Sequence, residues 1–171
     1  GWRMTYGIDV SKHQGVIDWS KVKTDFAILR AGLGRYTSQK DPMFERNYAG
    51  AKAAGIPVGV YWYSYAKSAE EAHEEAKACL QVLKGKQFEF PIYFDIEDST
   101  QEFLDKAVLT AMCEAFCGTL EKAGYFAGVY ASTYWFTSKL DHARLVGKYT
   151  IWLADYRAGY NKTLKRDMHQ Y

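Results

Sequence analysis

The segment Phe90-Pro91-Ile92-Tyr93-Phe94-Asp95-Ile96-Glu97-Asp98 is an apolar run that ends in acids, and it predicts a β-strand over 91–97. Side chains alternate along a strand, so Asp95 and Glu97 share one face and Ile96 lies on the other. Two neighbouring carboxyl groups raise each other's pKa, which favours keeping one of them protonated at neutral pH. A general acid that protonates a glycosidic oxygen beside an ionised partner needs this arrangement. The alternative is that these acids only cap the next helix, the role we expect for Asp98 and Ser99.

Strands and helices alternate on both sides of this segment. Further strands are predicted over 6–10, 26–31, 58–64, 125–131 and 149–154, with a seventh beginning at 168–171, and helices over 42–54, 68–84 and 101–123. Asp41 is expected to cap the first helix. The alternation predicts a parallel sheet, either open and doubly wound or closed into a barrel. No glycine-rich loop follows the first strand, which argues against a dinucleotide or phosphate site. Polar residues instead gather at the carboxyl ends of the strands, where barrel enzymes place their chemistry.

Composition limits the class of protein. A chain of 171 residues predicts a single domain over 1–171. A net charge of +2 does not indicate a nucleic-acid binder. The three cysteines form neither a disulfide framework nor a zinc site, so we expect no metal and no cofactor. No apolar run is long enough for a membrane helix. The start at Gly1 leads directly into a strand-like segment, so we expect no signal peptide within this chain.

Several residues at other strand ends could complete a sugar-binding site. Asp9 ends the first strand as Asp95 ends the fourth, and a barrel would bring the two together as catalytic acids with Glu97. Aromatic content is high, at 16%, and tyrosine and tryptophan can stack on sugar rings while offering a polar group. Each aromatic is individually more often a core residue. The predicted substrate-binding set is Tyr61, Tyr63, Tyr130, Trp152 and Asp155, the acid that follows the strand over 149–154.

Motifs along the whole chain resemble those of glycoside hydrolase family 25 lysozymes. They are Tyr6-Gly7-Ile8-Asp9-Val10-Ser11-Lys12-His13-Gln14-Gly15, Ile17-Asp18-Trp19, Asp41-Pro42, Phe44, Asn47, Ala54-Gly55-Ile56, Gly59-Val60-Tyr61, Phe94-Asp95-Ile96-Glu97, Trp152-Leu153-Ala154 and Gln170-Tyr171. The resemblance implies an irregular (β/α) TIM-like barrel and cleavage of peptidoglycan between N-acetylmuramic acid and N-acetylglucosamine. It makes Glu97 the general acid, with Asp95 either supporting the substrate acetamido group or positioning water. It also implies a monomer that acts on the cell wall, outside the cell.

The sequence departs from the family pattern in three places. Trp62-Tyr63 replaces the usual His-Phe, and Ala31-Gly32-Leu33 replaces the usual Ala-Thr-Glu. Family members also continue past Gln-Tyr to a last strand bearing another acid, so we expect this barrel to lack its last strand and to have an open seam.

The sequence leaves two alternative functions open. One is a chitinase-like or endo-N-acetylglucosaminidase barrel, and the other is a wall-binding module that has lost turnover.

Overall fold

The computed structural model describes residues 7–154 and 168–170, and its centre is a curled parallel β-sheet. The seven strands lie in the sheet in chain order, and every neighbouring pair is parallel. They are β1 (Gly7–Val10), β2 (Phe26–Leu33), β3 (Val58–Tyr63), β4 (Ile92–Asp95), β5 (Ala127–Ser132), β6 (Thr150–Ala154) and β7 (Met168–Gln170). The predicted α/β class with a parallel sheet is confirmed. In the described part of the chain, β1 and β7 are the two edges, so the sheet forms an open half-barrel.

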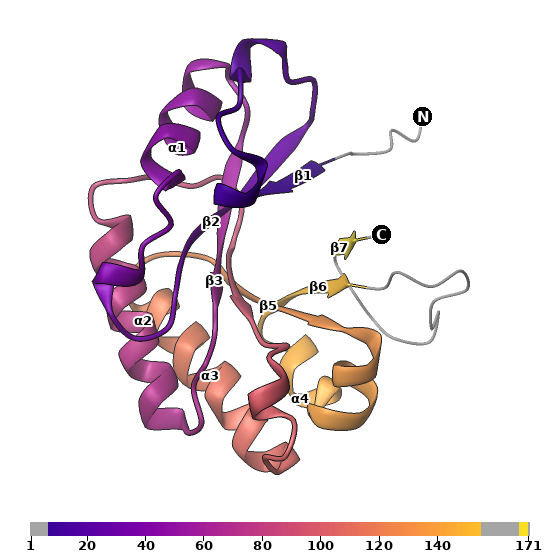
Figure 1. Ribbon diagram of the computed structural model, residues 1–171. Helices are drawn as coiled ribbons and strands as arrows, with labels where there is room; N and C mark the ends of the chain where they lie inside the picture. The colour runs from indigo at the N-terminus through magenta and orange to yellow at the C-terminus, as the bar shows by residue number, and fades with distance from the viewer. Residues whose placement is uncertain (1–6, 155–167, 171) are drawn as a thin grey trace.

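The helices connect successive strands and cover the outer side of the sheet (Figure 1). They are α1 (Phe44–Ala53), α2 (Ala69–Leu83), α3 (Lys106–Lys122) and α4 (His142–Val146). Short helical turns occur at Lys12–Gln14, Trp19–Lys21, Thr37–Gln39, Ser99–Gln101 and Trp135–Lys139. The predicted helix over 68–84 is confirmed, and the Ser68 side chain caps it by accepting a hydrogen bond from the Glu71 N–H at 3.1 Å. The predicted helix over 101–123 begins later, at Lys106, because the turn that Asp98 caps precedes it.

Asp41 does not cap α1 as predicted. The helix begins at Phe44, and its first residue is preceded by Met43, which makes no side-chain cap. The buried Asp41 carboxylate accepts hydrogen bonds from the Met43 N–H at 2.8 Å and from the Lys12 N–H at 3.0 Å. It also pairs with Arg30 at 2.7 Å. The acid therefore ties the loop before α1 to the loop after β1 and to β2.

The period of two residues along each strand separates two cores. One set of side chains points outward and packs under the helices: Ala27, Leu29, Val58, Val60, Trp62, Ile92, Phe94, Val129, Ile151 and Leu153. The alternate set forms a second cluster on the inner side of the curled sheet: Phe26, Ile28, Tyr93, Tyr130, Trp152 and Ala154. On that inner side, Gly128 has no Cβ because one would lie 2.7 Å from the Tyr93 ring. Inner-face side chains near the strand ends therefore face the space on the inner side of the curled sheet.

Candidate active site

A cavity of about 210 Å³ opens at the carboxyl ends of the strands, on the inner side of the sheet. Six consecutive strands, β1 to β6, contribute to it, with Glu97 following β4. Its lining residues are Asp9, Arg30, Tyr61, Tyr63, Asp95, Glu97, Tyr130 and Trp152. Seven of the eight predicted site residues thus surround one cavity. The eighth, Asp155, lies outside the described residues.

Asp95 and Glu97 lie on the same face of the chain, as the strand pattern predicts. Ile96 between them is fully buried on the opposite side, in the outer core. Asp95 is the buried member of the pair, with 4% of its surface exposed, whereas Glu97 is exposed to solvent at the cavity mouth. The Asp95 Oδ1 atom is buried and has no hydrogen-bond donor among the described residues. This strand end therefore aims two carboxyl groups of different exposure into the same space.

The pKa of both carboxyl groups is raised. Burial raises the pKa of Asp95 well above its usual range, and the charges of Glu97 and Asp9 add to the rise. Burial is also the largest cause of the raised pKa of Glu97. A hydrogen bond between the two carboxyl groups raises the pKa of Asp95 and lowers that of Glu97. The pair therefore holds a shared proton to higher pH than a free carboxyl group would.

Arg30 is a cavity residue that the sequence analysis missed. It comes from β2, in register with Tyr61 on β3. Its Nε donates to Asp41 Oδ2 at 2.7 Å, and the side chain is 11% exposed. The nearby guanidinium lowers the pKa of Asp95 and of Tyr61, which partly offsets burial. The alternation of side chains along the strand could have placed it. Arg30 follows Phe26 and Ile28 at steps of two residues, so it lies on the same inner face of β2.

The two tyrosines of β3 differ in how their hydroxyl groups are held. Burial raises the pKa of Tyr61, and a side-chain hydrogen bond with Ser11 lowers it. The Tyr63 hydroxyl donates to Asp98 Oδ1 at 3.0 Å, and burial and this bond raise its pKa. Both phenols therefore remain protonated in the physiological range and can act as hydrogen-bond groups.

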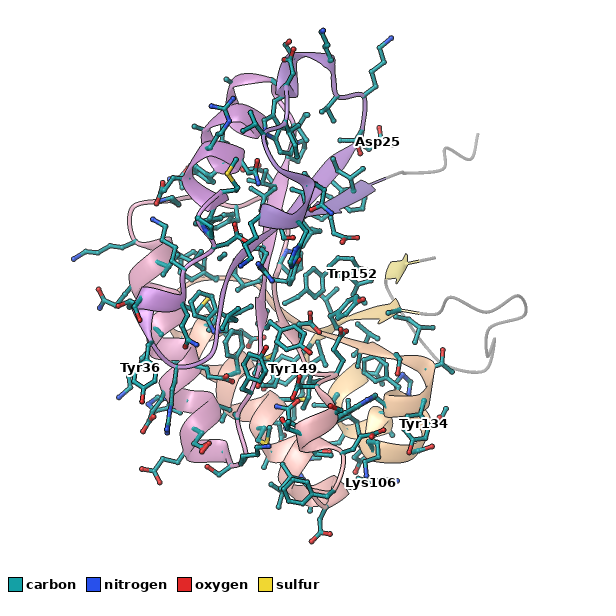
Figure 2. The ribbon with its side chains drawn as sticks, in the orientation of Figure 1. Asp25, Tyr36, Lys106, Tyr134, Tyr149 and Trp152 are labelled. Atoms are coloured by element: carbon teal, nitrogen blue, oxygen red, sulfur yellow. The ribbon has the colours of Figure 1, made fainter. Side chains whose placement is uncertain are left out.

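Tyr130 and Trp152 form the aromatic floor of the cavity. Their exposures are 7% and 4%, and their ring centroids are 4.6 Å apart in an edge-on arrangement. Trp152 also contacts Tyr93 edge-on at 5.1 Å, and it lies on the side of the sheet away from α1 and α2 (Figure 2). The Trp152 Nε1 atom is buried without a hydrogen-bond partner among the described residues. The floor therefore combines packed rings with an N–H donor that none of the described residues accepts from.

Among the described residues, no group of three or more histidines, cysteines or acids has the geometry to hold a metal ion. No helix in the same residues is both long enough and apolar enough to cross a membrane.

Paired carboxyl groups above aromatic rings, at the carboxyl ends of parallel strands, are an arrangement that glycoside hydrolases use. The sequence profile of glycosyl hydrolases family 25 matches residues 8–171. This chain belongs to that family.

Individual relatives agree with this assignment. The uncharacterized protein YegX of Escherichia coli (strain K12) is 28% identical over 160 residues, which covers 88% of this chain and 56% of YegX. Lysozyme M1 of Streptomyces globisporus is 46% identical over 61 residues, 34% of this chain and 20% of that protein. The structure of the modular autolysin LytC of Streptococcus pneumoniae matches with a TM-score of 0.80 at 27% identity, and covers 92% of this chain and 39% of LytC. The chain spans about half the length of YegX, and less than half of the other two.

Proposed function

We propose that this protein is an N-acetylmuramidase that hydrolyses the β-1,4 bond between N-acetylmuramic acid and N-acetylglucosamine in peptidoglycan. The observation that carries the proposal is the pair Asp95 and Glu97, which share one cavity and have raised pKa values. Membership of glycosyl hydrolases family 25 supports it. So do the names of similar proteins: one is a lysozyme, and LytC has a structure in complex with a synthetic peptidoglycan ligand.

In this proposal Glu97 is the general acid, because it is the more exposed carboxyl group at the mouth and can reach a bound glycan. Asp95 and Glu97 share a proton in the free protein, and Glu97 carries it when the substrate is bound. Glu97 then protonates the glycosidic oxygen, and the leaving sugar departs with that proton. Asp95, now ionised, either supports the acetamido group of the substrate or positions the attacking water.

In this proposal the remaining cavity residues bind the substrate and influence the protonation of the carboxyl pair. Asp9 adds a third negative charge that favours retention of the proton by the pair. Tyr61 and Tyr63 line the wall, and Tyr130 and Trp152 form the floor on which a sugar ring could pack. Asp155 is proposed as a further substrate contact from the sequence alone. The buried Nε1 of Trp152 suits a substrate oxygen that reaches the floor.

The finer description of the fold belongs to the same proposal. Residues 1–171 would form one catalytic domain, an irregular (β/α) barrel of the TIM type. The catalytic unit would work as a monomer on peptidoglycan strands outside the cell. The open half-barrel of seven parallel strands supports the barrel geometry.

Digestion of purified Gram-positive cell walls tests this function. The products are separated and their reducing ends are identified by mass spectrometry. Muramic acid at the new reducing ends is the expected result. Glucosamine there would instead support the endo-N-acetylglucosaminidase alternative, and binding to walls without products would support the non-catalytic module.

A further inference from the structure

Glu75 on α2 is a buried acid outside the candidate active site. It is 1% exposed, and burial raises its pKa to about 7. Its Oε1 atom accepts a hydrogen bond from the Ser64 hydroxyl at 2.6 Å, and its Oε2 atom accepts one from the Tyr65 N–H at 2.9 Å. The charges that also act on it are Glu71, which raises its pKa, and Arg35, which lowers it. Burial of a carboxyl group costs free energy, which its hydrogen bonds must offset.

Ser64 is the centre of this network. Besides donating to Glu75, its oxygen accepts from the Ala66 N–H at 3.1 Å and from the Gln101 Nε2 at 3.1 Å. A hydroxyl group has one hydrogen and two acceptor positions. Both acceptor positions of Ser64 are occupied, so its hydrogen can go only to the Glu75 oxygen. The Ser64 hydroxyl and the Tyr65 N–H both find acceptors when Glu75 accepts at both of its oxygens, as a carboxylate does. Gln101 Oε1, by contrast, is buried without a partner among the described residues.

The same network joins two loops that carry site residues. Ser64 directly follows Tyr63 at the end of β3, and its N–H donates to the Asp95 carbonyl oxygen at 3.0 Å. Gln101 lies in the turn that follows Glu97 and Asp98, and it also donates to the Ala66 carbonyl at 2.9 Å. Glu75, Ser64 and Gln101 are all buried. The end of β3 and the loop after β4 are therefore fixed to each other by these three bonds, one of them to the Ser64 hydroxyl, and the Glu75 carboxylate fixes the end of β3 to α2.

We propose that Glu75 is a positioning residue: through Ser64 it holds the loops after β3 and β4 so that Asp95 and Glu97 keep their places in the cavity. The inference rests on the proposed hydrolase function for its consequence in turnover. It does not rest on that function for its structural claim. Glu75 touches no substrate in this proposal and acts only through the loop backbone.

Two variants test the network, and a third serves as control. Glu75→Gln keeps the shape of the side chain but places an amide donor against either the Tyr65 N–H or the Ser64 hydroxyl. Ser64→Ala removes the shared hydroxyl and changes no charge. Glu74→Gln is the matched control, because Glu74 is the neighbouring residue on α2 and pairs only at the surface, with Arg35 at 3.5 Å. Circular dichroism and thermal unfolding establish that each variant is folded.

With soluble peptidoglycan fragments, we expect Glu75→Gln and Ser64→Ala to lower kcat roughly 10- to 100-fold, since small displacements of catalytic groups have effects of that order. KM should change by no more than about twofold, because the lining side chains are unaltered. The double variant should be little worse than either single one, since the two residues act through one network. Glu74→Gln should match the wild type. Wild-type kcat retained in folded Ser64→Ala and Glu75→Gln would overturn the proposal.

A second readout does not need activity. Carboxyl NMR titrations of Asp95 and Glu97 should show midpoints displaced on the order of half a pH unit in both Glu75→Gln and Ser64→Ala. A displacement in Glu75→Gln alone would be an effect of charge and would overturn the positioning role, as would unchanged midpoints in both. If the wild type cuts no wall, the proposed function fails, and these titrations still decide the role of Glu75.

Discussion

On the outer face of the sheet, Val60, Phe94 and Val129 are fully buried beneath the helices. On the inner face, their chain neighbours Tyr61, Asp95 and Tyr130 surround a cavity. The two sets come from the same strands, and their residues alternate along the chain. A single segment such as Phe94-Asp95 thus contributes one side chain to stability and the next to chemistry.

The inner face is the energetically costly one. Phe94 packs against Phe116 of α3 in a tilted arrangement with ring centroids 4.7 Å apart, a contact without polar atoms. Asp95 is nearly as buried, but its pKa is raised, and its Oδ1 has no donor among the described residues. Functional sites commonly hold such unfavourable groups, which the rest of the fold must offset. The two faces should therefore respond to substitution in opposite ways.

The largest expected effect is loss of activity in Glu97→Gln. Removing the proposed general acid should lower kcat on cell walls by about 10³-fold, within the range of general acid catalysis. Wall binding and the thermal midpoint should survive, because Glu97 is exposed. The control is Glu102→Gln, an exposed acid in the next turn. Turnover by Glu97→Gln at the wild-type rate would reject Glu97 as the acid.

The outer face should give the opposite result. Phe94→Ala removes a fully buried ring and should lower the free energy of unfolding by about 3–5 kcal/mol. Activity per folded molecule, measured well below the unfolding midpoint, should stay within about threefold of wild type. Urea unfolding followed by fluorescence gives the first quantity. A variant that keeps its stability but loses turnover would show that the faces are not separable.

Much of the fold could be predicted because local patterns and tertiary structure agree. The strand at β4 follows from an apolar run that ends in acids, and α2 follows from the Ser68 cap and its alanine-rich sequence. The helix predicted over 42–54 is present but begins at Phe44, and Asp41 does not cap it, because Asp41 bonds to Arg30 and Lys12, partners far away in the sequence. The turn at Trp135–Lys139 and α4 were also missed, since five-residue helices carry too little periodicity to be recognised.

The site was easier to predict than its support. Asp9, Asp95 and Glu97 were brought together as expected, because parallel strands in chain order place their carboxyl ends at one rim. The Arg30 side chain was missed because one charge in an apolar run gives no indication of its partner. Glu75 was missed for a related reason: its neighbouring acids on α2 are half-buried or exposed, and only the fold shows that Glu75 is buried against Ser64.

A smaller effect on activity is expected for Asp95→Asn. The amide keeps the shape of the side chain but cannot be ionised, and kcat should fall on the order of 10²-fold, as for loss of one electrostatic group in an active site. The same variant should be more stable than wild type at pH 8, since it removes a buried acid whose ionisation is unfavourable. Thermal unfolding at pH 8 measures this gain. A loss of both stability and activity would contradict the view that Asp95 is kept for chemistry.

The smallest effect concerns pH, and it contrasts the inner acids with those on the surface. Asp95 has a raised pKa in the folded protein, so between its unfolded and folded pKa the folded state binds more protons and stability falls as pH rises. Glu114, which pairs with Lys148 at 2.8 Å, has a lowered pKa, and its contribution is lost only as pH falls below the unfolded value. Above about pH 5.5, where ordinary carboxyl groups are already ionised, wild-type stability should therefore decline as pH rises. Asp95→Asn should make that decline shallower, whereas Glu114→Gln should leave its slope unchanged. Urea unfolding across this range measures the free energy of unfolding as a function of pH. If this dependence is the same in Asp95→Asn and the wild type, the ionisation of Asp95 does not contribute to stability.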